Sequence, residues 1–310
     1  MVEMGNNIVS LARVSETDLA TPVLKTLEAV NFKINPKVDN VLIKPNLCYY
    51  WDHLTGYTTD PRLVGCIIDV LRENYGLTGA NIKIVEADAT AMRTSHAFRM
   101  LKYDKLAEEK DVTLFNLAED KLGTHKVRVA GKEMSFDVPE SLLHADLFIN
   151  VPKMKIASTT ILTCAMKNIF GCIGAPRKIV YHPILNEAIV GINKILKPDV
   201  TVVDGIIALS NVPVRMNLIV TGLDTFSVDW AVSRIMGYGP FWIRYLKIAG
   251  KEGLGNPKSV QFEGENWREL RKAFPRVNPF RLKWQNKMQL KLLRLYSTIV
   301  GDVIPPFLES

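Results

Sequence analysis

The sequence predicts an α/β fold built on one mostly parallel sheet with helices on both faces, and two observations support this expectation. Short apolar runs that suit buried strands alternate along the chain with longer segments whose apolar residues recur every three or four positions. Leu147 to Val151 is continuously apolar except for Asn150, which is typical of a parallel strand that is covered on both sides. A small inserted β-hairpin and a C-terminal amphipathic helical extension complete the predicted architecture.

The first half of the chain is expected to alternate strands and helices. A strand at Val41 to Ile43 should end in Lys44-Pro45-Asn46, because proline cannot donate to a central ladder. Thr59-Asp60-Pro61 is typical of a helix start, with proline in the first turn. The other segments expected here are a strand at 7–14, a helix at 19–30, a helix at 63–75, a strand at 81–88, helical segments at 95–110, a strand at 112–117 and an exposed hairpin at 124–138.

The stretch from Asp146 to Pro183 carries the most informative pattern. Its apolar strand should stop near Asn150, before Pro152, and a loop should then present Lys153 and Lys155 on the same side. Ser158 or Thr159 is the expected cap of a helix that runs to Gly171. Downstream, we expect a helix at 186–196, strands at 200–204 and 217–221, and a helix at 225–236.

Composition and length bound the class of protein. The 310 residues are 47% apolar, enough for one large α/β domain, which we assign to 1–275, followed by an extension at 276–310. The four cysteines are dispersed and form no iron–sulfur or zinc motif, which favours reduced thiols and a cytoplasmic location. No run of 18 uncharged apolar residues and no signal-peptide pattern occurs, so neither membrane spanning nor secretion is expected.

The charge distribution indicates an anion-binding surface in the central stretch. No Asp or Glu occurs from Leu147 to Asn186, although the chain contains 32 acidic residues. The cations in this window are Lys153, Lys155, Lys167, Arg177 and Lys178. Ligands of open parallel sheets bind outside the carboxyl ends of the strands, so a small anion such as a carboxylate or phosphate should bind there.

Polar residues at the predicted strand ends are the candidate site. Candidates for proton transfer are Lys155, His182, Asp204 and Asp88, and candidates for binding a ligand or cofactor are Lys44, Asn46, Asn150, Lys153, Lys167 and Asn168. Structural alternatives stay open for several of them. Asp88 and Asp204 could cap helices or form turns, Lys167 could stabilise a helix end, and His182 could be a turn residue before Pro183. The sequence assigns no metal and no specific cofactor.

A combination of short motifs resembles the domain of unknown function 362 family. The motifs are Lys44-Pro45-Asn46, Thr58-Thr59-Asp60-Pro61, Asn150-Val151-Pro152-Lys153-Met154-Lys155, Lys167-Asn168 with Phe170-Gly171, His182 and Val203-Asp204-Gly205. The resemblance covers roughly residues 40–255 and implies an α/β fold. Some family members carry ferredoxin-like domains, which implies redox chemistry with a separate electron partner here, because this chain lacks such cysteines. The chain also differs from the family pattern at Ile156-Ala157 and after Gly205.

Three classes of function follow from these observations. The first is an enzyme, of oxidoreductase type by the resemblance, that acts on a small anionic metabolite or cofactor. The second is a binding module that holds the anion without turnover. The third is a protein whose basic segment at 276–296 contacts a membrane surface or nucleic acid. The sequence does not define the oligomeric state.

The C-terminal segment should form an amphipathic helix. Its apolar positions Phe280, Trp284, Met288, Leu292, Leu295 and Ile299 share one face, and the basic positions Lys283, Lys287, Lys291 and Arg294 share the neighbouring one. We expect this helix to dock on the domain, and membrane or nucleic-acid contact is the alternative.

Overall fold

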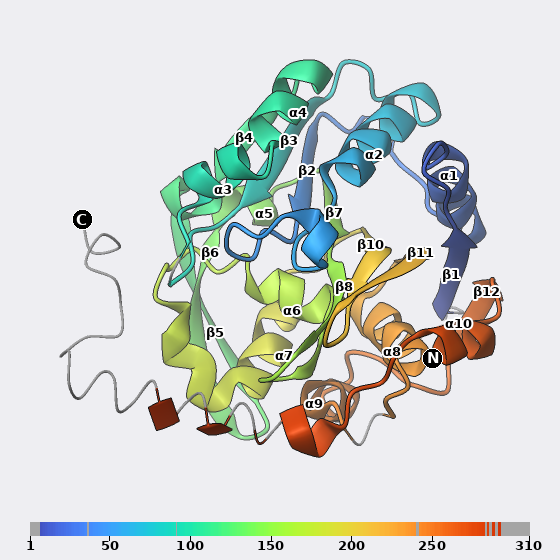
Figure 1. The fold of residues 1–310 in the computed structure, drawn as a ribbon. Helices are drawn as coiled ribbons and strands as arrows, with labels where there is room; N and C mark the ends of the chain where they lie inside the picture. Colours follow the sequence, from blue (N-terminus) through green and yellow to red (C-terminus); the bar gives the residue numbers. More distant parts are fainter. Residues whose placement is uncertain are drawn as a thin grey trace, which may run out of the picture.

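The computed structural model describes residues 7–35, 37–90, 92–239, 242–282, 284, 287–288 and 291–292. Its main feature is a 10-stranded sheet with the strand order β12-β1-β11-β10-β7-β2-β3-β4, which β8 and β9 join beside β10. Helices flank this sheet on both sides (Figure 1). The predicted α/β class with a mostly parallel sheet is therefore confirmed. Within the described residues, no helix is both long enough and apolar enough to cross a bilayer.

Five parallel strands form the part of the sheet that positions the candidate site. They are β2 (Asn40–Pro45), β3 (Asn81–Glu86), β4 (Thr113–Asn116), β7 (Leu147–Val151) and β10 (Val200–Leu209). β7 lies between β2 and β10 and pairs in parallel with both. The carboxyl ends of these strands therefore lie along one edge of the sheet. β2, β3 and β7 end at that edge with Pro45, Glu86 and Val151, and β10 passes it near Val203 and continues.

The other end of the sheet is partly antiparallel. β11 (Pro213–Gly222) pairs antiparallel with β10 and with β1 (Asn7–Arg13), and β12 (Val260–Gly264) is parallel to β1. β10 and β11 are each 10 residues long, about twice the predicted length. They are longer because residues on both sides of the Ser210 turn also pair, with Leu209 opposite Pro213. This long hairpin carries β10 beyond the ends of its parallel neighbours.

The chain after Pro152 differs from the prediction. It does not form a loop and a long helix but continues beside β10 as β8 (Lys153–Ala157), which turns back into β9 (Ile161–Thr163). Pro152 is tolerated there because its carbonyl oxygen accepts the Asp204 N–H at 2.8 Å, a bond that requires no proline N–H. The helix is only α6 (Ala165–Phe170), so Ser158 and Thr159 are not its caps.

Two sets of helices cover the two faces of the sheet. α1 (Ala20–Ala29), α2 (Pro61–Glu73), α3 (Thr94–Met100) and α4 (Tyr103–Lys110) pack over a core that includes Ile43 and Ile149. α6, α7 (Leu185–Ile195), α8 (Thr225–Ile235) and α9 (Arg244–Lys251) pack over a second core that includes Leu42 and Phe148. Neighbouring residues of one strand thus enter opposite cores, which explains the continuous apolar runs.

Two helix boundaries follow local signals. Asp60 caps α2 by accepting the Arg62 N–H at 2.9 Å, with Pro61 in the first turn, as predicted. The helical segment predicted at 95–110 is divided between α3 and α4, because Lys102 has a positive φ of 65° that ends the first helix. α5 (Glu140–Leu143) and α10 (Trp267–Ala273) are short.

The inserted hairpin consists of β5 (Leu122–Val129) and β6 (Lys132–Pro139), joined at Ala130-Gly131 as predicted. Both turn residues have positive φ, 48° and 79°, which matches the twist of a tight hairpin. Only one face of the hairpin is exposed. Phe136 is fully buried and lies against α7, where a side chain at Gly191 would come within 2.9 Å of its ring. The insertion is therefore part of the second core.

The C-terminal segment is described only in part, and Lys283, Arg294, Leu295 and Ile299 lie outside the described residues. Residues 279–282, 284, 287–288 and 291–292 have helical backbone, in agreement with the predicted helix. Leu282 is buried, but Phe280, Trp284, Met288 and Leu292 are exposed. The expectation that this apolar face docks on the domain is therefore wrong for Trp284, Met288 and Leu292, whereas the Phe280 ring packs edge-on against Trp242.

Candidate functional site

The predicted site residues do gather at the carboxyl edge of the parallel strands. Lys44 ends β2, Asn150 lies near the end of β7, and Lys153 and Lys155 lie in β8. Lys167 and Asn168 come from α6, which packs against β7. Most of these polar side chains are buried, with exposed fractions of 5% or less for Lys44, Lys153, Lys155, Asn150 and Asn168. Burial of so many polar groups requires specific partners for each.

Lys44 forms a buried ion pair with Glu86. Its ammonium nitrogen lies 2.9 Å from one carboxylate oxygen and 3.0 Å from the other, and it also donates to the carbonyl oxygen of Pro45. Glu86, at the end of β3, accepts the backbone N–H groups of Leu47 and Ala87 as well. Glu86 was not among the predicted candidates, which included Asp88 from the same strand end. Glu86 is the last residue of β3 and is buried like Ile84 and Val85 before it, which makes it a better candidate for the site than Asp88.

Lys153 forms a second buried ion pair, with Asp204. The ammonium nitrogen lies 2.8 Å from Asp204 Oδ2, and both side chains are fully buried. Asp204 also accepts the backbone N–H of Asp60 at 2.7 Å and of Ile206 at 3.0 Å. This carboxylate therefore ties β8, β10 and the start of α2 together. The partners of Asp204 are two backbone N–H groups and the Lys153 ammonium group. These contacts favour a structural role for Asp204 over proton transfer to a ligand.

Three asparagines connect the strands between the two ion pairs. Asn168 accepts hydrogen bonds from Lys44 at 3.2 Å and from Asn46 at 3.0 Å, and it donates to Asn150 Oδ1 at 2.8 Å. Asn150 in turn donates to Thr201 Oγ1 at 3.2 Å. The network joins β2, β7, β10 and α6 in one layer. Such a fully satisfied layer fixes the positions of the side chains that lie above it.

Lys155 is held by this layer and has no carboxylate partner within the described residues. Its ammonium group donates to Asn46 Oδ1 at 2.6 Å and to the Tyr57 carbonyl oxygen at 2.8 Å. It also lies 6.0 Å from the centre of the Tyr57 ring. Burial lowers the pKa of Lys155, and the nearby Lys153 and Lys44 cations lower it further. The predicted pair Lys153 and Lys155 is thus split into one neutralised and one uncompensated cation.

Lys167 is the second cation without a described carboxylate partner. Its ammonium group has only long contacts of 3.4 Å with the hydroxyl oxygens of Thr159 and Thr163. Desolvation, together with the neighbouring Lys155 cation, lowers its pKa to about 8. His182, an exposed residue of the 3₁₀ segment Lys178–Ile184, has a lowered pKa through partial desolvation and the Lys167 cation. The charge of Lys155 thus acts on Lys167, and the charge of Lys167 acts on His182.

Two residues that were not among the predicted candidates belong to the same edge. Lys178 is 6% exposed, donates to the Gly171 carbonyl oxygen at 2.7 Å, and has a pKa lowered to about 8 by burial. Cys48 is a free, half-buried thiol that is close enough to Lys155 and Lys167 to affect the pKa of both. The absence of acidic residues around Lys178 in the sequence could have indicated that it belongs to the site. Cys48 is a single dispersed cysteine, and no sequence pattern indicated its place there.

Asp88 has a structural role that the sequence left as its alternative. Its Oδ1 atom accepts the backbone N–H of Thr94 at 2.8 Å, at the start of α3, and the side-chain amide of Asn116 at 3.3 Å. It lies two residues beyond Glu86 and is turned to α3 and β4. The prediction of Asp88 as a proton-transfer residue is not supported by these contacts.

Asp229 supports the site from below through α6. This fully buried carboxylate accepts the backbone N–H groups of Ala165 and Met166 and the Tyr245 hydroxyl. It thus fixes the first turn of the helix that carries Lys167 and Asn168. Burial raises the pKa of Asp229 to about 7. No group of three or more metal-ligating side chains occurs in the described part of the chain, so these acids do not form a recognisable metal centre.

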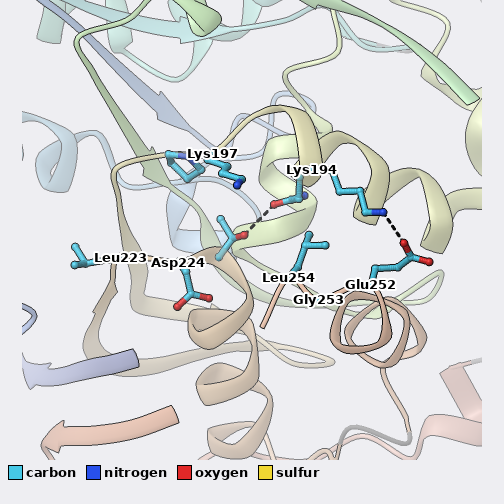
Figure 2. A pocket seen from close by; sticks show the side chains of 10 residues that line it. Lys194, Lys197, Leu223, Asp224, Glu252, Gly253 and Leu254 are labelled. Carbon is cyan, nitrogen blue, oxygen red and sulfur yellow. Dashed lines mark hydrogen bonds and ion pairs between the residues drawn. The ribbon is translucent and has the colours of Figure 1, made fainter. Parts of the chain in front are cut away.

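A separate pocket of about 400 Å³ lies at the opposite edge of the sheet (Figure 2). It is lined by residues before β10 and after β11, with Lys194 paired to Glu252 on one side. Asp224 caps α8 by accepting the Ser227 N–H, and Thr225 donates to Asn193 Oδ1 at 2.9 Å. These polar groups already have partners, and no predicted site residue lines the pocket.

The comparison with family models identifies one family. The family model described as Domain of unknown function (DUF362) matches residues 41–234, which is more than half of the chain. The thylakoid-associated protein sll1697 of Synechocystis sp. is 25% identical over 243 residues, 72% of this chain and 70% of that protein. The lactate racemase apoprotein structure from Thermoanaerobacterium thermosaccharolyticum matches with a TM-score of 0.41 and 12% identity, over 74% of this chain and 57% of the racemase. All candidate site residues fall within the range matched by the family model.

Proposed function

The chain belongs to the DUF362 family, and we propose that it is an enzyme that binds a small carboxylate- or phosphate-bearing metabolite or cofactor at the carboxyl edge of its parallel strands. One observation carries this proposal. Of the five lysines at that edge, Lys44 and Lys153 are neutralised by buried carboxylates, whereas Lys155, Lys167 and Lys178 have no such partner among the described residues.

An unneutralised cluster of buried cations is costly without a ligand. Each ammonium group loses hydration on burial, and neighbouring cations repel one another, as the lowered pKa values of Lys155, Lys167 and Lys178 reflect. An anion at this edge would compensate both costs through charge-assisted hydrogen bonds. The binding of an anion would offset the free energy lost through desolvation and repulsion. A binding site therefore explains the cluster better than a structural role.

Turnover is proposed because the site also contains groups suited to proton transfer. A lysine with a pKa near 8 exchanges its proton close to neutral pH, and Lys167 has such a value. Desolvation and the Lys167 cation lower the pKa of His182, which favours its neutral imidazole, a group that can accept a proton. A redox reaction with an external electron partner is suggested by the family resemblance alone. The alternative of a non-catalytic anion-binding module predicts the same ligand without turnover.

We also propose a cytoplasmic location. All four cysteines are free thiols, and Cys164 and Cys172 are buried within the second core. Reduced thiols are typical of the cytoplasm.

Substitution of Lys155 by Met tests the proposed anion site. The change keeps much of the aliphatic volume but removes the charge, so anion binding should weaken by about 1.5–3 kcal/mol, the usual value of a charged hydrogen bond. Lys167→Met should weaken binding to a similar extent, because Lys167 also lacks a described carboxylate partner. The measurement is calorimetric and thermal-shift titration with phosphate, nucleotides and small carboxylates.

Lys197→Met is the matched control for these two variants. Lys197 is exposed and lines the pocket at the opposite edge of the sheet, so its loss should leave anion binding unchanged. If wild type, both site variants and the control respond equally to every anion, the site is wrong. A separate experiment distinguishes the enzyme from the binding module. Mass spectrometry of ligands that copurify with the wild-type protein would identify a candidate substrate, and a turnover assay with this compound would show whether it is converted.

Anion binding should depend on pH with a transition near pH 8. Lys167 and Lys178 have pKa values lowered to about 8, so both are mostly protonated below this pH and lose their charge above it. Affinity for sulfate, whose charge is constant here, should therefore be highest below pH 8 and fall above it by up to about tenfold per pH unit for each proton lost. Calorimetry at several pH values checks this. Lys167→Met should show a shallower decline, and a wild-type affinity constant from pH 7 to 10 would contradict the prediction.

A further inference from the structure

The described part of the C-terminal segment carries an exposed apolar face. Phe280, Trp284, Met288 and Leu292 are 68%, 63%, 39% and 60% exposed, and they follow one another at intervals of four residues with helical backbone. This interval places them along one side of a helix. Contiguous large apolar side chains are rarely left in water on a soluble protein unless they contact a partner.

The segment is anchored to the domain at its start, by residues that include Phe280, and the apolar positions Trp284, Met288 and Leu292 beyond this anchor are exposed. Leu282 is 5% exposed, Val277 is 3% exposed, and the Tyr238 hydroxyl donates to the Val277 carbonyl oxygen at 2.8 Å. The ring of Phe280 lies edge-on to Trp242 with a centroid distance of 5.2 Å. Residues 277–282 thus fix the start of the helix, and the apolar positions after them have no cover within the described residues.

The charges beside this face have one sign. Arg281, Lys287 and Lys291 are exposed. On a helical projection Lys287 borders the apolar residues, Lys291 lies between Phe280 and Trp284, and Arg281 lies between Met288 and Leu292. No acidic residue occurs in the sequence between Glu269 and Asp302. A partner that covers this surface must therefore offer an apolar region and negative charge together.

The surface of a bilayer with anionic lipids has both properties. A helix that lies in the interface buries its apolar side chains at the level of the acyl chains, while lysines beside them extend to the phosphate groups. RNA offers negative charge, but it has no apolar layer for Met288 and Leu292. A second copy of the chain would bring the same positive charges together, and they would repel.

We propose that the C-terminal helix is a peripheral docking surface for membranes that contain anionic lipids. Phe280, Trp284, Met288 and Leu292 enter the interface, and Arg281, Lys287 and Lys291 bind the lipid phosphates. The interaction is reversible and independent of the anion site, since the two surfaces share no residue.

Vesicle cosedimentation of the full chain tests this proposal. Wild type should bind vesicles of phosphatidylcholine mixed with phosphatidylglycerol, and should bind pure phosphatidylcholine at least about tenfold more weakly. Trp284→Ser/Leu292→Ser should lower the apparent affinity for the mixed vesicles about tenfold or more, because two large apolar side chains no longer enter the interface. Lys287→Glu/Lys291→Glu should have an effect of similar size on mixed vesicles only, and added salt should reduce wild-type binding.

Two matched double variants serve as controls. Met100→Ser/Val212→Ser removes apolar residues that are 60% and 59% exposed elsewhere, and Lys25→Glu/Lys33→Glu makes the same change in net charge on another surface. Both should bind like wild type. Failure of wild type to bind mixed vesicles would overturn the proposal, as would unchanged binding by Trp284→Ser/Leu292→Ser. Tight, salt-sensitive binding to single-stranded RNA with no vesicle binding would assign the surface to nucleic acid, and concentration-dependent dimers abolished by the apolar variant would assign it to a second copy.

Discussion

Asp204→Ala is expected to destabilise the protein by about 3–5 kcal/mol. The substitution leaves the Lys153 ammonium group buried without its counter-ion, and breaking one partner of a buried ion pair typically costs this much. It also leaves the backbone N–H groups of Asp60 and Ile206 without their acceptor. Urea denaturation of wild type and variant measures the change in the free energy of unfolding.

A second variant separates the charge from the hydrogen bonds. Lys153→Met/Asp204→Leu removes both charges, so it should be more stable than Asp204→Ala, although the two backbone N–H groups still lack a partner. Glu16→Ala is the control for an ion pair in water. Glu16 lies 2.6 Å from Arg215, but both side chains are more than half exposed, so its loss should cost less than about 1 kcal/mol. Equal costs for Asp204→Ala and Glu16→Ala would show that burial of the Lys153 pair is unimportant.

Those parts of the fold that depend on local pattern could be predicted from sequence. Apolar runs and prolines located β2, β7 and the start of α2, and the general rule for parallel sheets then placed their ends at one edge. The hairpin β5–β6 followed from its turn residues. The buried face of that hairpin could not be predicted, because it depends on the approach of α7, which is distant in sequence.

The largest error concerned residues 153–164, and its cause is physical. The apolar positions Ile161, Leu162, Ala165 and Met166 fit a helical spacing, but the first two belong to β9. Ile161 has a positive φ of 69°, which is rare for a β-branched residue and ends any helix there. β8 and β9 form because β10 extends beyond its parallel neighbours and offers a free edge, which is a tertiary effect.

The sequence predicted the location of the candidate site better than it predicted the roles of the residues in it. Cations at strand ends identified Lys44, Lys153 and Lys155, but the sequence could not show which of them are neutralised. That depends on Glu86 and Asp204, which reach the lysines from other strands. The structure therefore moves the proposed ligand contacts from Lys153 to Lys155 and Lys167, two of the three lysines at this edge without a described carboxylate partner.

Asp229→Ala is expected to cost at least about 3 kcal/mol and to weaken anion binding although Asp229 does not reach the site edge. The variant leaves the buried N–H groups of Ala165 and Met166 and the Tyr245 hydroxyl without their acceptor, each worth about 1–3 kcal/mol. The first turn of α6 would then be free to shift, and Lys167 would move with it. Tyr245→Phe is the control, because it removes one of the three donors and should cost about 1 kcal/mol with normal anion binding.

The pH dependence of stability gives an independent check on Asp229. Its pKa is raised from 3.8 to about 7, so the folded state holds this proton over a range in which the unfolded state has lost it. The contribution of Asp229 to stability should therefore be greatest near pH 4 and decline as the pH rises to 7, by at most about 1.4 kcal/mol per pH unit. Asp229→Asn cannot titrate, so the unfolding free energy of wild type minus that of Asp229→Asn should fall over the same interval. A difference that stays constant from pH 4 to 7, or that grows, would show that this carboxylate is ionised throughout and caps α6 as a charged group.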